Sequence, residues 1–371
     1  MTGNASPLHT LAQLGQSVWY DNIHRQLIDS GELARMVRED GLTGVTSNPA
    51  IFEKAVTGSD DYDTVIANSL RQGIKDPEAL FVALSLADIG DAADVLRPVY
   101  DRSGGRDGYV SIEVSPLLAD DTRATTEEAR HLFRTLGRAN VMIKVPGTRA
   151  GLGAIDTLIA EGIPVNVTLL FAVGRYREVA EAYLRGLETR SAQGLPLERV
   201  ASVASFFVSR VDGAVDPRLA AAAPELAGRT AIANARAAYR HFRTVFGGER
   251  FQRLAKTGAQ PQRLLWASTS TKNPDYPETL YVDELIGEQT VTTLPPATFD
   301  AYRERGAPAP RLDQAAAELE DFFAALAQTG VDLDAETARL EADGVQAFVD
   351  AYRNLLSAIE RKAAALNRAS A

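Results

Sequence analysis

Apolar residues along the chain follow two alternating patterns. Short runs that are apolar throughout, or at every second position, are typical of strands, and eight of them occur. They lie at residues 16–23, 41–48, 108–115, 140–147, 163–170, 200–211, 263–270 and 288–295. Most of the segments between them carry apolar residues three and four apart, which is typical of a helix with one buried face. The helical segments are 25–40, 77–103, 126–139, 151–162, 171–194, 217–256 and 277–287.

Repeated alternation of strand and helix favours parallel strands joined by right-handed crossovers. Eight such units suit a closed (β/α)₈ barrel. An open, doubly wound sheet is the alternative, but it usually brings a Gly-rich phosphate turn after the first strand, and no such turn follows residue 23. We therefore predict an α/β fold of the TIM-barrel type with additional N- and C-terminal helices.

Two further helical segments, residues 312–330 and 334–366, follow the last strand. Gly330 and Asp332 separate them and supply a stop and a start signal. Because two helices bury little surface alone, we expect them to pack on the barrel or on another subunit. The chain is thus predicted to be one domain, residues 1–371, with a helical extension over about 310–371, and it could form a homo-oligomer.

Composition narrows the possible partners and cofactors. The formal net charge of −10 argues against binding to nucleic acid or anionic membranes, which needs a basic face. There are no cysteines, and the four histidines are scattered, so we expect no metal site. The N-terminus lacks a secretory pattern and no apolar run reaches about 18 residues, which predicts a cytoplasmic protein without membrane spans.

Polar residues occur late in nearly every predicted strand. In a barrel of this type the carboxyl ends of the strands face the active site, whereas a structural core would be Val, Ile and Leu throughout. The polar residues are Asp21, Asn48, Glu113, Lys144, Asn166, Thr168, Ser205 and Arg210. We therefore expect a polar site at this end of the barrel.

Lys144 stands within the apolar run VMIKV. A lysine at a strand end often reaches solvent or pairs with a carboxylate. An amine in an apolar wall can instead lose its charge, which makes it a nucleophile for carbonyl carbons and suits Schiff-base chemistry. That chemistry requires proton transfer, for which Asp21 and Glu113 are the candidate carboxylates. Alternatively, Asp21 is a turn residue and Glu113 the ion-pair partner of Lys144.

A phosphate site is expected near the later strands of such a barrel. Arg210 and Lys272 follow predicted strands there, with Ser268 near the lysine, although each is individually compatible with a surface position. Phe207 should share a face with Ser205 and either packs in the barrel mouth or contacts substrate.

Six motifs, VTSNP, SIEVSP, MIKVPGT, VNVTLLF, SFFVSRVD and WASTSTKNP, occur in an order that resembles the transaldolases, and specifically their longer bacterial form. The resemblance extends from about residue 17 to about 295. It implies class I aldolase chemistry without a cofactor, in which a dihydroxyacetone unit is transferred between sugar phosphates of the non-oxidative pentose phosphate pathway.

The same resemblance implies roles for individual residues. Lys144 would be the Schiff-base residue and Asp21 the proton-transferring acid. Glu113 and Thr168 would position a catalytic water, and Asn48 and Asn166 would hold substrate hydroxyls.

Ser205, Phe207 and Arg210 match the family pattern S-x-F-x-x-R, in which the serine contacts substrate and the arginine binds phosphate. Lys272, beside Ser268, stands where shorter members have a second phosphate-binding arginine.

Two alternatives to a transaldolase stay open from the sequence. A related aldolase would use the same imine and release dihydroxyacetone, although related fructose-6-phosphate aldolases tend to have glutamine where this chain has Glu113. A non-catalytic barrel would bind sugar phosphates or proteins without forming a covalent adduct.

Overall fold

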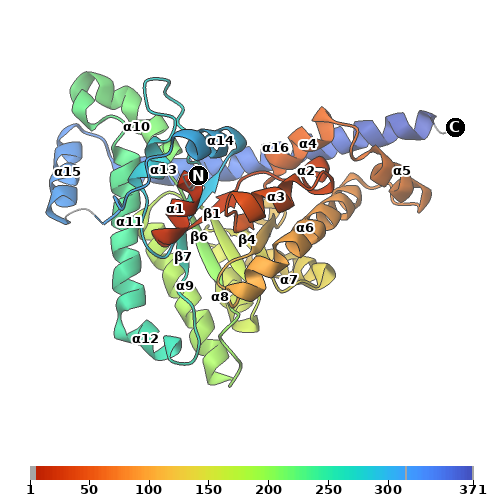
Figure 1. Cartoon of the computed structure of the whole chain (residues 1–371), viewed down its shortest axis with the longest axis horizontal. Coiled ribbons are helices and arrows are strands. Elements are labelled where there is room, and N and C mark those ends of the chain that lie inside the picture. Colours follow the sequence, from red (N-terminus) through yellow and green to blue (C-terminus); the bar gives the residue numbers. More distant parts are fainter. Residues whose placement is uncertain (1–5, 314–315, 370–371) are drawn as a thin grey trace, which may run out of the picture.

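The computed structural model describes residues 6–313 and 316–369. Its centre is a closed barrel of eight parallel strands that follow one another in chain order, with helices around it (Figure 1). The strands are β1 (Gln16–Tyr20), β2 (Gly44–Val45), β3 (Tyr109–Glu113), β4 (Val141–Pro146), β5 (Val165–Leu170), β6 (Ser202–Phe207), β7 (Arg263–Ala267) and β8 (Thr290–Leu294). Each lies within one of the eight predicted runs, so the predicted TIM barrel is confirmed.

Helices surround the barrel and extend beyond it at both ends of the chain. They are α1 (Pro7–Gln13), α2 (Arg25–Asp29), α3 (Glu32–Glu39), α4 (Pro49–Gly58), α5 (Asp63–Arg71), α6 (Pro77–Arg102), α7 (Thr122–Leu136), α8 (Gly151–Glu161), α9 (Val173–Ala192), α10 (Ser209–Ala222), α11 (Thr230–Gly247), α12 (Glu249–Ala255), α13 (Leu280–Glu284), α14 (Pro296–Arg305), α15 (Ala316–Gln328) and α16 (Leu333–Ala369), with short 3₁₀ turns η1 (Pro116–Leu118) and η2 (Pro224–Leu226). None of the helices within the described ranges combines the length and the apolar character needed to cross a membrane.

Several helix boundaries differ from the prediction. The segment 25–40 forms two helices, because Gly31 adopts a left-handed conformation with φ of 78° between them. The Ala-rich span from Pro217 to Lys256 contains the end of α10, which begins earlier at Ser209, and the whole of α11 and α12. Arg210 therefore lies in the first turn of α10 and not on the sixth strand. Helix α1 is the predicted additional helix at the N-terminus, although no residue range was given for it, whereas α4, α5 and α14 were not predicted.

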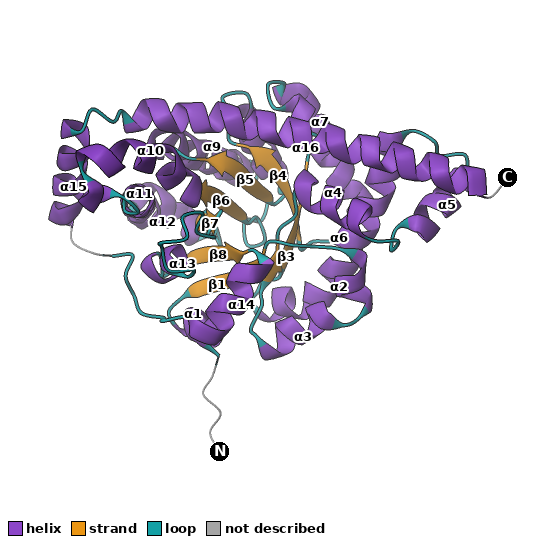
Figure 2. Cartoon of the chain, turned by 90° about the horizontal axis from the view of Figure 1, so that it is seen from above, coloured by secondary structure: helices purple, strands orange, loops and turns teal. Residues whose placement is uncertain are grey.

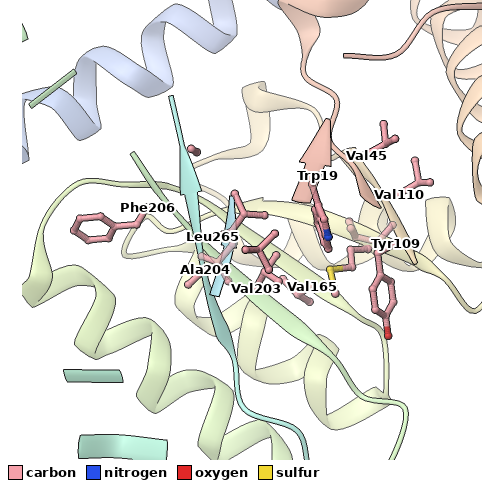
Figure 3. Packing of buried hydrophobic residues seen from close by; sticks show 14 of the residues in the cluster. Trp19, Val45, Tyr109, Val110, Val165, Val203, Ala204, Phe206 and Leu265 are labelled. Atoms are coloured by element: carbon pink, nitrogen blue, oxygen red, sulfur yellow. The ribbon is translucent and has the colours of Figure 1, made fainter. Parts of the chain in front are cut away.

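Large apolar side chains fill the barrel interior. Trp19, Val203 and Leu265 pack together there and are at most 1% exposed (Figure 3). The short strand β2 contributes Gly44, where a Cβ atom would lie 2.4 Å from Cε2 of Trp19. A glycine at this position therefore makes room for the indole ring inside the barrel.

The two C-terminal helices pack on the rest of the molecule. Phe322 and Leu326 of α15 join an apolar cluster with Val215 and Leu219 of α10. Helix α16 runs past β4 and β5 (Figure 2), and its Phe348, Leu355 and Ile359 belong to the same apolar core as the barrel. The extension thus buries its apolar face within this chain.

Candidate active site

Strand register brings three of the predicted site residues into one row. Glu113 of β3 lies beside Lys144 of β4, and Lys144 lies beside Asn166 of β5. Thr168 pairs with Pro146, two residues further along the same pair of strands. Since all eight strands run in one direction, these side chains meet at the carboxyl end of the barrel.

The amine of Lys144 is buried but has polar neighbours. Its side chain is 6% exposed, and Nζ donates a hydrogen bond of 2.9 Å to the carbonyl oxygen of Ser47. Glu113 Oε2 lies 3.4 Å from Nζ, and the centroid of the Phe348 ring lies 5.8 Å from it. The surroundings are therefore not the purely apolar wall that the strand pattern suggests. The carboxylate offers an acceptor for the proton that an ammonium must lose to become a nucleophile.

Glu113 and Thr168 have unused hydrogen-bonding capacity. Apart from the ion pair with Lys144, neither carboxylate oxygen of Glu113 accepts a hydrogen bond from a described residue, and the Thr168 hydroxyl likewise has no described partner. Burial raises the pKa of Glu113 to about 7, against the opposing effect of Lys144. A carboxyl group with a pKa near neutrality can both accept and return a proton during turnover.

Asp21 follows β1 and is held in place by a pair of threonines. Thr46 Oγ1 donates a hydrogen bond of 2.7 Å to Asp21 Oδ1, and it lies 2.8 Å from Thr293 Oγ1. Burial raises the pKa of Asp21, whereas the hydrogen bond from Thr46 and the charge of Lys144 lower it. The threonines were not predicted as site residues, although in the predicted strand run 41–48 Thr46 lies two positions before Asn48 and would share a strand face with it.

Asn166 is buried in a hydrogen-bonded chain across the barrel. Its Nδ2 donates to Ser111 Oγ at 3.0 Å, and its Oδ1 accepts from Ser205 Oγ at 2.6 Å. Asn48 has a local role as well, because its Oδ1 accepts a hydrogen bond from the backbone of Ile51 at the start of α4. These hydrogen bonds fix the side-chain rotamers of Asn166 and Asn48. The amide hydrogens and lone pairs that are not used in them therefore point in defined directions.

A cavity of about 280 Å³ opens at this end of the barrel, and nine of the eleven predicted residues line it. Glu113 and Asn166 are the two that do not. Arg210 lies in the cavity wall with its guanidinium 5.3 Å from the ring centroid of Phe207. Within the described ranges it makes no hydrogen bond or ion pair, and burial lowers its pKa. A half-buried cation that has no hydrogen-bond acceptor is suited to binding an anionic ligand.

The rim of the cavity near β7 carries Ser268 and Lys272. Ser268 has φ of 56°, a left-handed conformation that is uncommon for serine, and its hydroxyl lies 2.9 Å from Ser209 Oγ at the start of α10. Lys272 is exposed and donates a hydrogen bond of 2.8 Å to Ser270 Oγ. Both residues thus lie on the Arg210 side of the cavity, with Lys272 nearer to solvent.

Helix α16 completes the cavity wall with Ala347, Phe348 and Ala351. The sequence gives no signal for this, because an amphipathic helix can bury its apolar face against many surfaces. Gly344 allows the close approach, since a Cβ atom there would lie 3.2 Å from Cδ2 of Leu169 at the end of β5.

Other parts of the described chain offer weaker candidates for a site. No group of three or more His, Asp or Glu residues arranged to hold a metal ion occurs in residues 6–313 and 316–369. A larger cleft of about 650 Å³ lies between α11 and α15, but it contains none of the predicted residues, and its Arg236 and Arg243 form ion pairs with Glu284 and Asp313.

Comparison with known proteins gives consistent matches over nearly the whole chain. A family model described as Transaldolase/Fructose-6-phosphate aldolase matches residues 18–359. The chain is 48% identical over 353 residues to a protein named Transaldolase from Thiobacillus denitrificans, which covers 94% of this chain and 98% of that protein. It is 47% identical over 365 residues to Transaldolase 1 of Streptomyces coelicolor, covering 97% and 96%, respectively. It is 45% identical over 367 residues to Transaldolase 2 of a Nostoc species, covering 95% and 96%.

Proposed function

The chain belongs to the transaldolase/fructose-6-phosphate aldolase family, and on this premise we propose that Lys144 is the residue that carries its reaction as a Schiff base. The activity is that of a transaldolase: a dihydroxyacetone unit passes from sedoheptulose 7-phosphate to glyceraldehyde 3-phosphate, which gives erythrose 4-phosphate and fructose 6-phosphate. The proposal rests above all on the position of Lys144 Nζ, buried at the cavity wall and 3.4 Å from Glu113.

Formation of the imine begins with transfer of the ammonium proton of Lys144 to Glu113. The free amine attacks the ketose carbonyl carbon, and the carbinolamine then loses water to give the protonated Schiff base. Glu113 and Thr168 have unused hydrogen-bonding groups at this position, which suits them to bind the water that carries protons between carbinolamine and carboxylate. The pKa of Glu113, raised by burial to about 7, favours transfer in both directions.

Cleavage of the carbon–carbon bond requires a base for the C4 hydroxyl of the bound ketose. Asp21 takes this role, because it lines the same cavity as Lys144 and its orientation is fixed by Thr46. As the proton leaves, the C3–C4 bond breaks and the aldehyde departs. The electron pair of that bond remains on the dihydroxyacetone unit, which becomes an enamine. The acceptor aldehyde then reacts with the enamine, and the same steps run in reverse.

Arg210 is the principal phosphate ligand in this proposal, and Lys272 is a second cation at the rim. The unpaired guanidinium of Arg210 supports the assignment, since a phosphate would provide the hydrogen-bond acceptors that the described residues do not. Asn48, Asn166, Ser205 and Ser268 would contact hydroxyl groups of the substrate or the intermediate.

Trapping with sodium borohydride tests the proposal directly. Reduction in the presence of fructose 6-phosphate should convert the imine into a stable secondary amine, and peptide mapping should locate the added mass on Lys144. Lys272 and the exposed Lys256 serve as internal controls that should stay unmodified. An adduct on either of them would refute the assignment of Lys144, and a wild-type protein that forms no adduct would favour the non-catalytic barrel.

A related aldolase would release dihydroxyacetone in place of transferring it. The relatives compared above are all named transaldolase, and Glu113 is a carboxylate where the related aldolases tend to have glutamine. Product analysis with fructose 6-phosphate and no acceptor distinguishes the two reactions, because only the aldolase should produce free dihydroxyacetone at a rate comparable with turnover.

We also propose that residues 1–371 form one domain and that the protein acts in the cytoplasm on sugar phosphates. The shared apolar core of α16 and the barrel supports the first point. Formation of a homo-oligomer stays a prediction, which light scattering of the purified protein can check.

A further inference from the structure

Phe348 of α16 lies over the amine of Lys144. Its ring centroid is 5.8 Å from Nζ, its side chain belongs to the apolar core, and the residue is 8% exposed. It lines the cavity together with Ala347 and Ala351, which are small and leave space beside the ring. An aromatic face thus covers part of the space around the amine where water could otherwise lie.

Ion pairs and hydrogen bonds hold α16 on both sides of Phe348. Before it, Glu341 accepts from Arg175 of α9 at 3.1 Å. After it, the Tyr352 hydroxyl donates to Glu78 of α6 at 2.7 Å, and Lys362 Nζ lies 2.8 Å from Asp63 of α5. Figure 2 shows the helix extending across this whole side of the molecule. These contacts fix the helix, and therefore the ring, relative to the barrel.

The position of the ring matters because the enamine on Lys144 has two fates. Reaction with an acceptor aldehyde forms a new carbon–carbon bond, and hydrolysis of the resulting imine then releases the product ketose and returns the amine. Alternatively, the nucleophilic carbon takes a proton, water adds across the resulting C=N bond, and the C–N bond breaks to return the amine and free dihydroxyacetone. Each route consumes one water molecule when its imine is hydrolysed, but only the second route needs a proton donor at the nucleophilic carbon. Exclusion of bulk water from that carbon therefore favours transfer.

We infer that Phe348 is a specificity-determining residue, which favours transfer over release by keeping bulk water away from the dihydroxyacetone unit on Lys144. The inference rests on the proposed function. It assigns to the C-terminal helix a part in the choice of reaction, in addition to its packing on the barrel. The ring also lies close enough to interact with the positive charge of the protonated imine.

The test compares Phe348→Ala, Phe348→Leu and the matched variant Leu355→Ala. Leu355 is fully buried two turns further along α16 and does not line the cavity, so its truncation weakens helix packing without opening the site. For each protein, two initial rates are measured: release of dihydroxyacetone from fructose 6-phosphate alone, and formation of sedoheptulose 7-phosphate when erythrose 4-phosphate is added.

Phe348→Ala should raise the ratio of release to transfer about tenfold, with a smaller rise for Phe348→Leu and no change for Leu355→Ala. An unchanged ratio in both Phe348 variants, or an equal rise in Leu355→Ala, would overturn the inference. If Phe348→Ala does not fold, Phe348→Leu decides alone. Borohydride trapping of the wild-type protein separates the two levels: without an adduct on Lys144 the proposed function fails, whereas an adduct with an unchanged ratio refutes only the role of Phe348.

Discussion

The ion pair between Asp107 and Arg263, at the amino-terminal end of the barrel, is about as deeply buried as the pair Glu113 and Lys144 at the carboxyl end. The side chains are 10% and 5% exposed in the first pair and 4% and 6% in the second. Their surroundings differ. Asp107 also accepts hydrogen bonds from Trp19 Nε1 at 2.8 Å and from Ser17.

Arg263, at the same end, also has hydrogen-bond partners in addition to the ion pair. It donates to Ser17 Oγ at 2.7 Å and to the carbonyl oxygen of Arg106 at 2.8 Å. At the carboxyl end, by contrast, Glu113, Thr168 and Arg210 all have polar atoms without a hydrogen-bond partner in the described part of the chain.

Burying a polar group without a partner costs free energy, so the two ends make opposite contributions to stability. A satisfied network rigidifies the barrel, whereas unsatisfied groups remain free to bind substrate, water and phosphate. Buried charge alone therefore does not mark a functional site in this molecule; what distinguishes Glu113 from Asp107 is its unused hydrogen-bonding capacity.

Removal of the Lys144 amine, at the carboxyl end of the barrel, should abolish activity. Lys144→Ala is expected to lower kcat for transfer by about 10⁴-fold or more, because the covalent route is lost. A coupled assay measures transfer, and circular dichroism checks the fold. Lys256→Ala, which removes an exposed lysine, is the control and should keep full activity. Substantial turnover in Lys144→Ala would contradict the Schiff-base assignment.

Removal of the Asp107 carboxylate, at the amino-terminal end of the barrel, should lower the stability of the protein but not its catalytic rate. Asp107→Ala leaves Arg263 buried without its ion pair and Trp19 without its acceptor, so the free energy of unfolding should fall by about 3–5 kcal/mol. Urea denaturation measures this loss.

Asp107→Asn, which keeps an acceptor for Trp19, should lose less. The kcat of folded Asp107→Ala should stay within about twofold of wild type, since the pair is remote from the cavity residues. A large fall in kcat with unchanged stability would reverse the roles assigned to the two ends.

Glu113 should make stability depend on pH. Burial raises its pKa to about 7, from an ordinary value of 4.5. Between these values the folded protein holds a proton that the unfolded chain has lost. The contribution of Glu113 to stability is therefore full below about pH 4.5 and is lost as pH rises through 7, by on the order of 3 kcal/mol.

Glu113→Gln should remove this pH dependence, so urea denaturation at pH 5 and pH 8 should show wild type losing stability relative to the variant. The variant's kcat should be about 10²-fold lower, because a neutral amide cannot take the proton. Parallel pH profiles of the two proteins would show that Glu113 does not titrate in this range.

The same contrast holds for two arginines: Arg263 donates hydrogen bonds to protein groups, whereas Arg210 has no hydrogen-bond partner in the described residues. Arg210→Ala should raise KM for sugar phosphates by about 10-fold or more while lowering the free energy of unfolding by only about 1 kcal/mol or less, because the contact with the Phe207 ring is lost but no hydrogen bond or ion pair is. Steady-state kinetics with fructose 6-phosphate measures the first effect. Unphosphorylated fructose is the control substrate, and its kcat/KM should be unaffected. A loss for both sugars would point to altered cavity shape and not to phosphate binding.

Sequence patterns were sufficient for the barrel and for the row of Glu113, Lys144 and Asn166. All eight runs with strand periodicity form strands of the barrel. Parallel register then brings residues late in neighbouring strands together, independently of where the helices begin and end. The boundary near Arg210 was not predictable in the same way. Helix α10 begins without a side-chain cap, so the apolar run continues into it without a start signal.

Asn48 and Pro49, by contrast, form a recognisable N-cap and first-turn pair that could have revealed α4. Phe348 had no such signal. Its contact with Lys144 joins segments far apart in the chain, and the apolar face of α16 would look the same if it packed against any other surface.

The smallest effect is expected at Lys272. This residue is exposed at the cavity rim, where its ammonium is a solvated point charge with only Ser270 as a described hydrogen-bond partner. Lys272→Ala should therefore raise KM for fructose 6-phosphate only about two- to threefold. Because exposed charges are screened by salt, the difference from wild type should largely disappear at about 0.5 M sodium chloride. The effect of Arg210→Ala should persist there, since its guanidinium is half-buried and acts at short range. If the two variants show the same salt dependence, the distinction between an enclosed and an exposed phosphate ligand is wrong.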